Sequence, residues 1–322
     1  MGEFDLIRRY FSPPVLHTRL AGGDDAALIV PSSRDTELAL TTDLLVAGQH
    51  FFMEMEPERL GYKAAAVNLS DIAAMGAQPR WALLGLVLPT MDEPWVEAFS
   101  RGFRQSLASY QVDWIGGDTT AGPMALAVTM VGEVPQGQAL RRSGACVGDD
   151  IWVSGTLGDA ALGLDYRLGR CQLPEVACKL ALERFELPVP RVELGMALRG
   201  VAHSAIDLSD GLLADLDHLV TASRVGAVLE VGCLPVSLAQ PGTWRDVEWC
   251  RRVLQGGEDY ELCFTAEPCH RSGLSQLGAQ LGVPLTRIGT VTAEPKQRLL
   301  RDPQGAEMSL AWRGFDHFQD IS

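Results

Sequence analysis

Lysine is scarce in this sequence, and several familiar nucleotide-binding motifs are absent from it. The 322 residues include only three lysines, Lys63, Lys179 and Lys296, and none of them stands in a G-x-x-x-x-G-K-[ST] pattern, so a Walker phosphate loop is excluded. The pattern G-x-G occurs nowhere, which excludes the dinucleotide-binding fingerprint and the glycine-rich loop of protein kinases. Any binding of phosphate groups must therefore depend on other residues.

Cysteine and long apolar runs are also sparse. The first 145 residues contain no cysteine, the total of seven is odd, and no C-x-x-C occurs, so neither a disulfide framework nor a zinc ribbon is supported. The N-terminal residues lack the apolar segment of a signal peptide. The longest apolar stretches, residues 81–88 and 124–132, are far shorter than the roughly 18 to 20 residues that span a bilayer. We expect a soluble, cytoplasmic protein with no membrane partner.

Positive charge is in deficit. Lysine and arginine number 27 against 41 aspartates and glutamates, which gives a formal net charge of -14. This balance argues against a nucleic-acid partner, because nucleic-acid binders neutralise phosphates with basic side chains. Anionic substrates remain possible if cations other than side chains neutralise them.

Length and periodicity predict two domains of mixed α/β or α+β class. Strands are expected at residues 37–43, 81–88, 112–115, 124–134, 151–154, 228–231, 261–265 and 286–291. Helices are expected at residues 3–11, 58–75, 93–110, 175–185, 191–201 and 211–223, with another after the turn at 155–158. Residues 135–150 are rich in glycine and polar residues without periodicity. We place the boundary there, with domains at 1–147 and 148–322.

A series of acidic residues beside glycine, serine or threonine is spread across both halves of the chain: Asp25, Asp43, Asp71, Asp118, Asp207, Asp210 and Glu258. Carboxylates at tight turns and strand ends are typical ligands of hard cations such as Mg²⁺. Each acid alone is more often explained as a turn or a helix cap. Taken together they favour a metal site, because Asp43, Asp118 and Asp207 each end an apolar run that is typical of a strand.

Three further features are candidates for substrate contacts. Arg142 follows an irregular stretch and could bind phosphate oxygens in a bidentate manner, or it is a solvated surface arginine. His50 could hydrogen-bond a substrate phosphate, although a histidine beside aromatic residues is often structural. The aromatic residues of segment 312–318 could stack on a flat ring or pack on the core.

The sequence closely resembles the thiamine-monophosphate kinase family in segments that follow one another in the same order: GGDDAAL, TTDLLVAGQHF, YKAAAVNLSDIAAMGA, IGGDTTAGP, RRSGACVGDDIWVSGTLGDAALGL, SAIDLSDGL, GGEDYELCF and WRGFDHF. This family shares a superfamily with aminoimidazole-ribonucleotide synthetase and selenophosphate synthetase. The resemblance extends from Gly2 to Phe318, and the combination of TTDLLVAGQHF with GGEDYELCF is specific.

The resemblance implies an N-terminal α/β domain that dimerises through its sheet to give a homodimer, and a C-terminal α+β domain, with ATP between the domains. The implied reaction converts ATP and thiamine monophosphate to ADP and thiamine diphosphate, as the last step of thiamine diphosphate biosynthesis. The implied ligands of several Mg²⁺ ions are Asp25, Thr41, Thr42, Asp43, Asp71, Asp118, Asp207 and Asp210. The implied ATP contacts are Gly117, Asp118, Arg142 and Ser209. The implied substrate contacts are His50, Glu258 and Phe315, the last at a position where relatives often carry tyrosine, so that Trp312 could share the stacking.

The chemistry of this reaction needs little from a base. A phosphate monoester has a second pKa of about 6, so its oxygen is largely ionised at neutral pH. We therefore expect direct in-line transfer, promoted by positioning and charge neutralisation, with no covalent nucleophile and no obligate base.

Two other members of the superfamily are disfavoured. Selenophosphate synthetase normally needs a reactive cysteine or selenocysteine near the N-terminus, and the hydrogenase-maturation relative needs a C-terminal cysteine, whereas the cysteines here run from Cys146 to Cys269. A metal-dependent phosphohydrolase or a non-catalytic metal- or nucleotide-binding module would also use acidic clusters.

Overall fold

The computed structural model describes residues 9–11, 14–20 and 26–312, and the chain forms two compact units. Unit 1 comprises Met1–Ile72 and Ala77–Ala139, and unit 2 comprises Ala73–Gly76 and Leu140–Ser322. The chain enters unit 2 a little before the boundary expected at residue 147. The Leu140 N–H donates to the Met75 carbonyl at 3.0 Å and the Ala205 N–H donates to the Arg141 carbonyl at 2.9 Å, and these bonds tie the irregular segment to unit 2.

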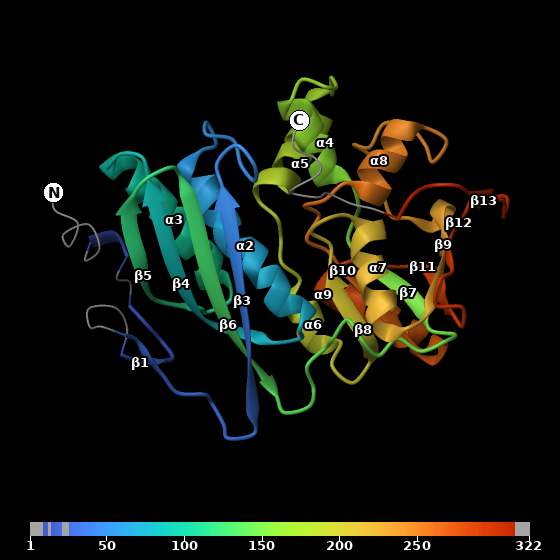
Figure 1. The fold of residues 1–322 in the computed structure, drawn as a ribbon, viewed down its shortest axis with the longest axis horizontal. Coiled ribbons are helices and arrows are strands. Elements are labelled where there is room, and N and C mark those ends of the chain that lie inside the picture. Colours follow the sequence, from blue (N-terminus) through green and yellow to red (C-terminus); the bar gives the residue numbers. More distant parts are fainter. Residues whose placement is uncertain (1–8, 12–13, 21–25, 313–322) are drawn as a thin grey trace. The chain divides into compact units, whose positions relative to one another are not determined.

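Unit 1 is built on a four-stranded sheet in the order β3-β6-β4-β5 (Figure 1). Its elements are the short pair β1 (Thr18–Leu20) and β2 (Leu28–Ile29), the strands β3 (Thr36–Val46), β4 (Gln78–Leu88), β5 (Asp113–Ala121) and β6 (Ala125–Pro135), and the helices α2 (Pro57–Ala74) and α3 (Glu93–Ser109). Strands β3 and β4 are each antiparallel to β6, and β4 is parallel to β5. Helix α2 connects β3 to β4 and α3 connects β4 to β5, so both crossovers join parallel strands and run from the β3 edge towards the β5 edge. Because such crossovers are right-handed, both helices lie on the same face of the sheet.

The two faces of this sheet differ in burial. On one side, α2 and α3 bury large side chains such as Leu69, Phe99 and Phe103 completely. On the other side, the alternating residues Leu40 and Leu44 of the edge strand β3 are 67% and 65% exposed. Alternation along a strand puts such residues on a common face, so unit 1 presents an uncovered apolar surface.

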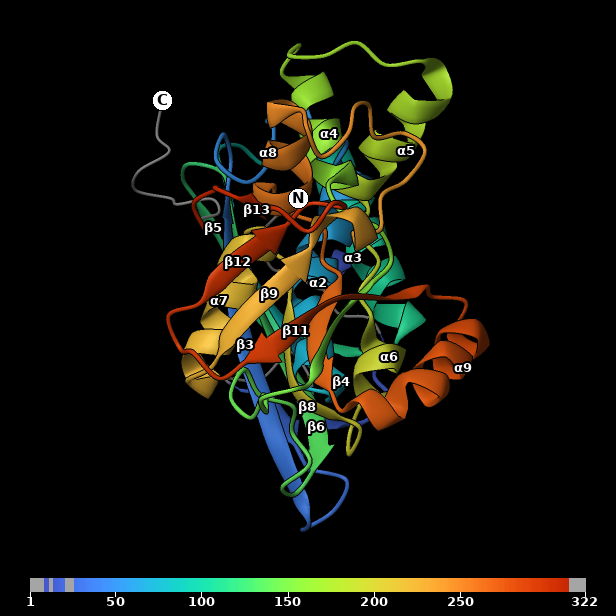
Figure 2. The same cartoon turned by 90° about the vertical axis from the view of Figure 1, so that its right-hand side faces the viewer.

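Unit 2 contains a seven-stranded sheet in the order β13-β12-β9-β11-β7-β10-β8, and Figure 2 shows β12, β9 and β11 side by side. Its strands are β7 (Asp150–Ser154), β8 (Ala202–Asp207), β9 (Gly226–Glu230), β10 (Leu262–Ala266), β11 (Leu285–Thr292), β12 (Arg298–Arg301) and β13 (Glu307–Met308). Its helices are α4 (Asp159–Arg167), α5 (Glu175–Glu186), α6 (Val192–Ala197), α7 (Leu212–Ser223), α8 (Val247–Gln255) and α9 (Arg271–Leu281), with 3-10 turns η1 (Val231–Cys233) and η2 (Pro268–His270). All strand pairs in this sheet are antiparallel except β12 with β9.

The core of unit 2 lies between this sheet and helices α7 and α8. Leu216 of α7 and Val253 of α8 pack with Val153 of β7 and Cys263 of β10 in one buried cluster. The intervening residues of the strands point to the opposite face, as expected for a strand. There the Trp152 ring stacks with a neighbouring phenylalanine of β10 at 6.4 Å between centroids.

The mixed α/β class predicted from the sequence is confirmed, but two strand ends were placed wrongly. Asp43 and Asp118 do not end their strands, because β3 continues to Val46 and β5 continues to Ala121. Both strands are edges of the four-stranded sheet, where polar side chains within a strand are tolerated. The expected helix at 3–11 lies mostly outside the described residues. None of the helices in the described part of the chain combines the length and the apolar character that crossing a bilayer requires.

Candidate functional site: two clusters of carboxylates

Asp43 and Asp71 form the acidic centre of unit 1, on strand β3 and helix α2. The Thr41 hydroxyl donates a short hydrogen bond to the Asp71 carboxylate. The main-chain N–H of Asp43 donates to the Asn68 side-chain oxygen at 3.2 Å, and the Asn68 amide donates to the Ala64 carbonyl at 3.2 Å. Asn68 stands three residues before Asp71 on the same helix face, so this side chain holds α2 and β3 in the register that brings the two acids together.

The electrostatics of this pair are those of a cation site. Burial raises the pKa of the Asp43 carboxyl to about 7, and repulsion from Asp71 adds to the rise. A cation beside the two carboxylates would remove that repulsion and restore the ionised form. The structure thus brings together three of the residues expected to be metal ligands, Thr41, Asp43 and Asp71.

Asp118 and Thr42 lie differently. Asp118 lies opposite Gly85 of β4. Asp43 lies opposite Val128 of β6, which in turn lies opposite Leu84 of β4, so the two aspartates belong to adjacent rows of paired residues across the sheet. Side chains of adjacent rows point to opposite faces, so unit 1 does not place the Asp118 carboxylate beside Asp43. Thr42 also faces away from Asp43, and its hydroxyl lies 2.8 Å from that of a threonine on β6.

Gly117 fixes the backbone just before Asp118. Its φ of 149° lies in a region that favours glycine, and a Cβ there would come within 1.8 Å of the Leu84 carbonyl oxygen. The exposed Asp118 carboxylate accepts the N–H of Thr119 at 2.8 Å. The close approach of β4 therefore requires glycine at position 117.

His50 lies in the turn that follows β3. The ring Nδ1 accepts a hydrogen bond from the Val46 N–H at 2.9 Å, and the main-chain N–H of His50 donates to the Val46 carbonyl at 3.0 Å. With Nδ1 acting as the acceptor, the proton of the neutral ring is on Nε2. The ring therefore presents a donor at Nε2, the function expected of a contact to phosphate.

A second acidic cluster lies in unit 2 where β8 leads into α7. Asp207 is the last residue of β8, and Asp210 stands just before α7. The Asp215 carboxylate accepts the N–H groups of Asp210 at 3.0 Å and Gly211 at 3.2 Å. Burial raises the pKa of Asp215 to about 8, with repulsion from Asp207 and then Asp210 adding to the shift. Sequence reasoning missed Asp215, although its position in LSDGLLAD, on the helix that the acidic turn begins, was a usable signal.

The pKa of Asp215 predicts how the stability of the metal-free protein depends on pH. Its folded-state pKa of about 8 lies above that of an aspartate in an unfolded chain, so the protonated form stabilises the fold and this contribution is lost as the pH rises through about 8. From pH 7 to pH 9 this group alone should lower the free energy of unfolding by roughly 1 kcal/mol. Asp215→Asn keeps an oxygen that can accept both N–H groups and should abolish that decrease. Urea unfolding in EDTA measures the effect, and an identical pH dependence in both proteins would contradict it.

The segment GGEDYEL packs directly against this cluster. The Glu258 N–H donates to the Ser209 carbonyl and the Tyr260 N–H donates to the Leu208 carbonyl, both at 2.8 Å. A Cβ at Gly257 would lie 2.3 Å from the Ser209 carbonyl oxygen, so the approach requires glycine. Glu258 has a φ of 69° and Tyr260 a φ of 49°, a strained conformation that often accompanies function. The expected ATP contact Ser209 and the expected substrate contact Glu258 are therefore neighbours.

Asp259, between these two strained residues, is a buried anchor that sequence reasoning also missed. Its carboxylate accepts the N–H of Gly158 at 2.8 and 3.1 Å, at the N-terminus of α4. Burial raises the pKa of this carboxyl well above its usual range, while the hydrogen bond from Gly158 opposes the shift. The side chain of Asp259 thereby fixes the loop that carries Glu258.

The remaining expected contacts are less informative. The Arg142 side chain is exposed, and its carbonyl accepts the Ser223 hydroxyl at 3.0 Å. Trp312 packs against the unit 2 core with the Arg298 guanidinium 5.7 Å from its ring centroid, which favours the core-packing alternative for this residue. Asp25 and Phe315 lie outside the described residues.

The sequence and the fold agree with known proteins. Residues 23–134 match the family of AIR synthase related proteins, N-terminal domain, which gives the class of the N-terminal part of the chain. The thiamine-monophosphate kinase of Salmonella typhimurium is 47% identical over 98% of both chains. The crystal structure of thiamine-monophosphate kinase from Stenotrophomonas maltophilia K279a is 44% identical and covers 91% of this chain and 92% of its own, with a TM-score of 0.83.

A third relative carries bound ligands. The structure of AaThiL complexed with AMPPCP and TMP is 29% identical, covers 98% of this chain and 97% of its own, and has a TM-score of 0.75. This structural similarity, together with the 47% identity to the Salmonella enzyme over 98% of both chains, establishes the family of the chain. The chain belongs to the thiamine-monophosphate kinase family, and the family predicted from the sequence is confirmed.

Proposed function

We propose that the protein transfers the γ-phosphoryl group of ATP to thiamine monophosphate, giving ADP and thiamine diphosphate, as the last step of thiamine diphosphate biosynthesis in the cytoplasm. The observation that carries this proposal is the similarity over nearly the whole chain to thiamine-monophosphate kinases. The AaThiL complex with AMPPCP and TMP adds the pair of ligands that such a reaction needs.

Magnesium is implied by the family resemblance, and the donor set fits it. Each acidic cluster offers oxygen ligands only, and in each cluster burial, followed by repulsion from a neighbouring carboxylate, raises the pKa of a carboxyl. When bound, Mg²⁺ would neutralise the charges of the triphosphate and the acceptor phosphate. The proposed ligands are Asp25, Thr41, Thr42, Asp43, Asp71, Asp118, Asp207 and Asp210. Within unit 1, Asp43 and Asp118 lie on opposite faces of the sheet, which supports more than one ion.

The remaining residues are proposed to bind and orient the two substrates. For ATP, these are Gly117 and Asp118 on β5, Arg142 and Ser209. For the thiamine monophosphate, the His50 Nε2–H donates to the phosphate and the Glu258 carboxylate suits the positively charged thiazolium ring. Phe315 is proposed to contact the ring system. Because the acceptor oxygen is already ionised, these residues act by alignment for in-line attack and not as a base.

A coupled assay of ADP release tests the function. Thiamine, thiamine monophosphate and an aminoimidazole ribonucleotide are supplied in parallel, with EDTA as the control. ADP should form only with thiamine monophosphate and only with the divalent ion. Release of inorganic phosphate from ATP or from thiamine monophosphate alone would instead identify a phosphohydrolase.

His50→Ala should weaken the binding of thiamine monophosphate more than it slows the chemical step. Loss of a hydrogen bond to a charged group costs about 1.5 to 3 kcal/mol, which corresponds to roughly a tenfold to hundredfold rise in the KM for this substrate. The KM for ATP should change little. His218→Ala on the exposed side of α7 is the matched control. An unchanged KM for thiamine monophosphate in His50→Ala would remove His50 from the site.

The uncovered face of the unit 1 sheet supports a homodimer. Leu40 and Leu44 form an apolar stripe on β3 together with Leu38 and Val46, all of them exposed. We propose that a second copy of the chain covers this face. Light scattering coupled to size exclusion should report a dimer for the wild type and a monomer for Leu40→Glu/Leu44→Glu. Leu238→Glu, at a fully exposed leucine of unit 2, should remain a dimer. A monomeric wild type at micromolar concentration would refute the proposal.

A further inference from the structure

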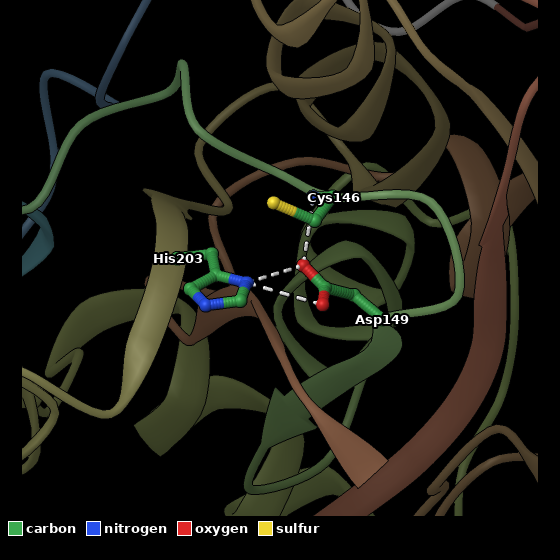
Figure 3. Close-up of side chains that lie close together, drawn as sticks. All are labelled: Cys146, Asp149 and His203. Carbon is green, nitrogen blue, oxygen red and sulfur yellow. Dashed lines mark hydrogen bonds and ion pairs between the residues drawn. The ribbon is translucent and has the colours of Figure 1, made fainter.

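Three side chains with sulfur, nitrogen and oxygen donors lie together where the chain enters unit 2 (Figure 3). Cys146 and Asp149 belong to the turn that precedes β7, and His203 lies near the start of β8. One ligand atom from each residue falls within a group whose members are all within 4.8 Å of one another. The proposed kinase reaction uses none of these three residues.

The turn between Cys146 and Asp149 is held by the backbone. The Cys146 N–H donates to the Asp149 Oδ2 at 2.8 Å, and the Asp149 N–H donates to the Cys146 carbonyl at 3.0 Å. The Asp149 carbonyl in turn accepts the N–H of Val291 at 2.9 Å, so the turn is attached to β11. The Asp149 side chain is buried, whereas Cys146 is exposed. The backbone of this turn thus fixes the positions of Cys146 and Asp149, and the side of Cys146 is accessible to solvent.

His203 faces the carboxylate with one nitrogen and a second acid with the other. Its Nδ1 lies 2.9 and 3.1 Å from the two oxygens of Asp149, and its Nε2 lies 3.7 Å from a carboxylate oxygen of Glu267. Histidines that bind metals usually direct their second N–H to a carboxylate, which fixes the tautomer and the ring. Glu267 is in position to serve in this way while Nδ1 binds an ion.

We propose that Cys146, Asp149 and His203 form a binding site for a divalent cation of the Zn²⁺ type. Thiolate, imidazole and carboxylate are the ligands of Zn²⁺, whereas Mg²⁺ takes oxygen ligands. Bonds of about 2.0 to 2.3 Å to a tetrahedral ion separate the ligand atoms by roughly 3.3 to 3.8 Å. His203 Nδ1 and the Asp149 oxygens, now 2.9 and 3.1 Å apart, therefore move slightly apart as the ion replaces their hydrogen bond, and rotation of the exposed Cys146 side chain brings its sulfur to the ion. The thiol now points to the Gly144 carbonyl at 3.5 Å, and its proton passes to solvent when the ion binds. Water completes the coordination on the open side.

Titration with Co²⁺ in saturating Mg²⁺ tests this site on the full-length protein. A thiolate bound to cobalt gives a charge-transfer band in the near ultraviolet that carboxylate sites cannot produce, and Zn²⁺ should abolish the band by displacement. In the wild type the band should grow until one Co²⁺ is bound per chain. Cys146→Ser should lose it, and His203→Gln should bind Co²⁺ at least tenfold more weakly.

Cys269→Ser is the matched control, because Cys269 is exposed and its Sγ lies 3.4 Å from Glu267. This variant should keep the band and the affinity of the wild type. A wild type without the band, a band that survives in Cys146→Ser, or a band lost in Cys269→Ser would each overturn the assignment. Circular dichroism of every variant establishes that the fold is intact.

Discussion

Replacing Asp43 by asparagine should lower the turnover of thiamine monophosphate by about 10² to 10³-fold or more while the fold survives. The substitution keeps the shape of the side chain and removes one of the two charges of the Asp43–Asp71 pair. The hydrogen bond to Asn68 is made by the main chain of residue 43 and is therefore retained. The loss should thus report the charge that holds the ion and not the position of β3.

The assay is ADP release over a series of Mg²⁺ concentrations, with the thermal unfolding of the variant as a check. Asp35→Asn, at an exposed aspartate just before β3, is the matched control and should behave as the wild type. Without divalent ions, Asp43→Asn should be at least as stable as the wild type, because repulsion from Asp71 is removed. Near-normal turnover at low Mg²⁺ would show that Asp43 does not bind the metal.

A companion variant distinguishes shared from separate ions. Asp118 and Asp43 face opposite sides of the sheet, so within unit 1 they do not hold the same ion. Binding of Mn²⁺ to Asp43→Asn, Asp118→Asn and the double variant should therefore give losses of free energy that add. A double variant that binds no more weakly than the poorer single variant would mean that one ion joins both carboxylates.

The fold was predictable where the local signals were strong. Pro57 and the apolar periodicity placed α2 within a residue or two, because proline at a first turn and a buried face are both encoded locally. Helices α8 and α9 were missed, since α8 follows a turn-rich stretch and α9 has few buried positions. The strand ends at Asp43 and Asp118 were misplaced, because only the order of the strands reveals that β3 and β5 are edges.

The acidic clusters were predictable in composition and not in arrangement. Short motifs marked Asp43, Asp71 and the LSD turn as candidates, and the seven acidic candidates equal half of the net charge of -14. The backbone pairing of Glu258 with Ser209 depends on two segments far apart in the sequence. The contact of Asp259 with Gly158 likewise joins segments that are distant in the sequence. No local pattern encodes these long-range contacts.

Glu261 holds the end of the loop that carries Glu258. Glu261→Gln should cost about 3 to 5 kcal/mol of unfolding free energy. Its side chain is only 1% exposed and lies between two arginines. Arg191 binds it with Nε at 2.6 Å and Nη2 at 2.5 Å, and Arg184 approaches at 3.1 Å. The Ser154 hydroxyl donates to the same carboxylate at 2.6 Å. Glutamine keeps the volume but turns an amide towards one of the guanidinium groups, so buried positive charge is left without a counter-charge.

Urea unfolding followed by far-ultraviolet circular dichroism measures this loss. Glu307→Gln on the exposed edge strand β13 removes the same charge without such partners and should stay within about 0.5 kcal/mol of the wild type. The Glu261 carbonyl accepts the Leu208 N–H at 2.9 Å, so loosening this residue should also loosen the acidic turn beside Ser209. Weaker Mg²⁺ binding should therefore accompany the lower stability. A Glu261→Gln variant with normal stability and normal Mg²⁺ affinity would mean that the ion pairs of Glu261 with Arg184 and Arg191 do not hold the loop in place.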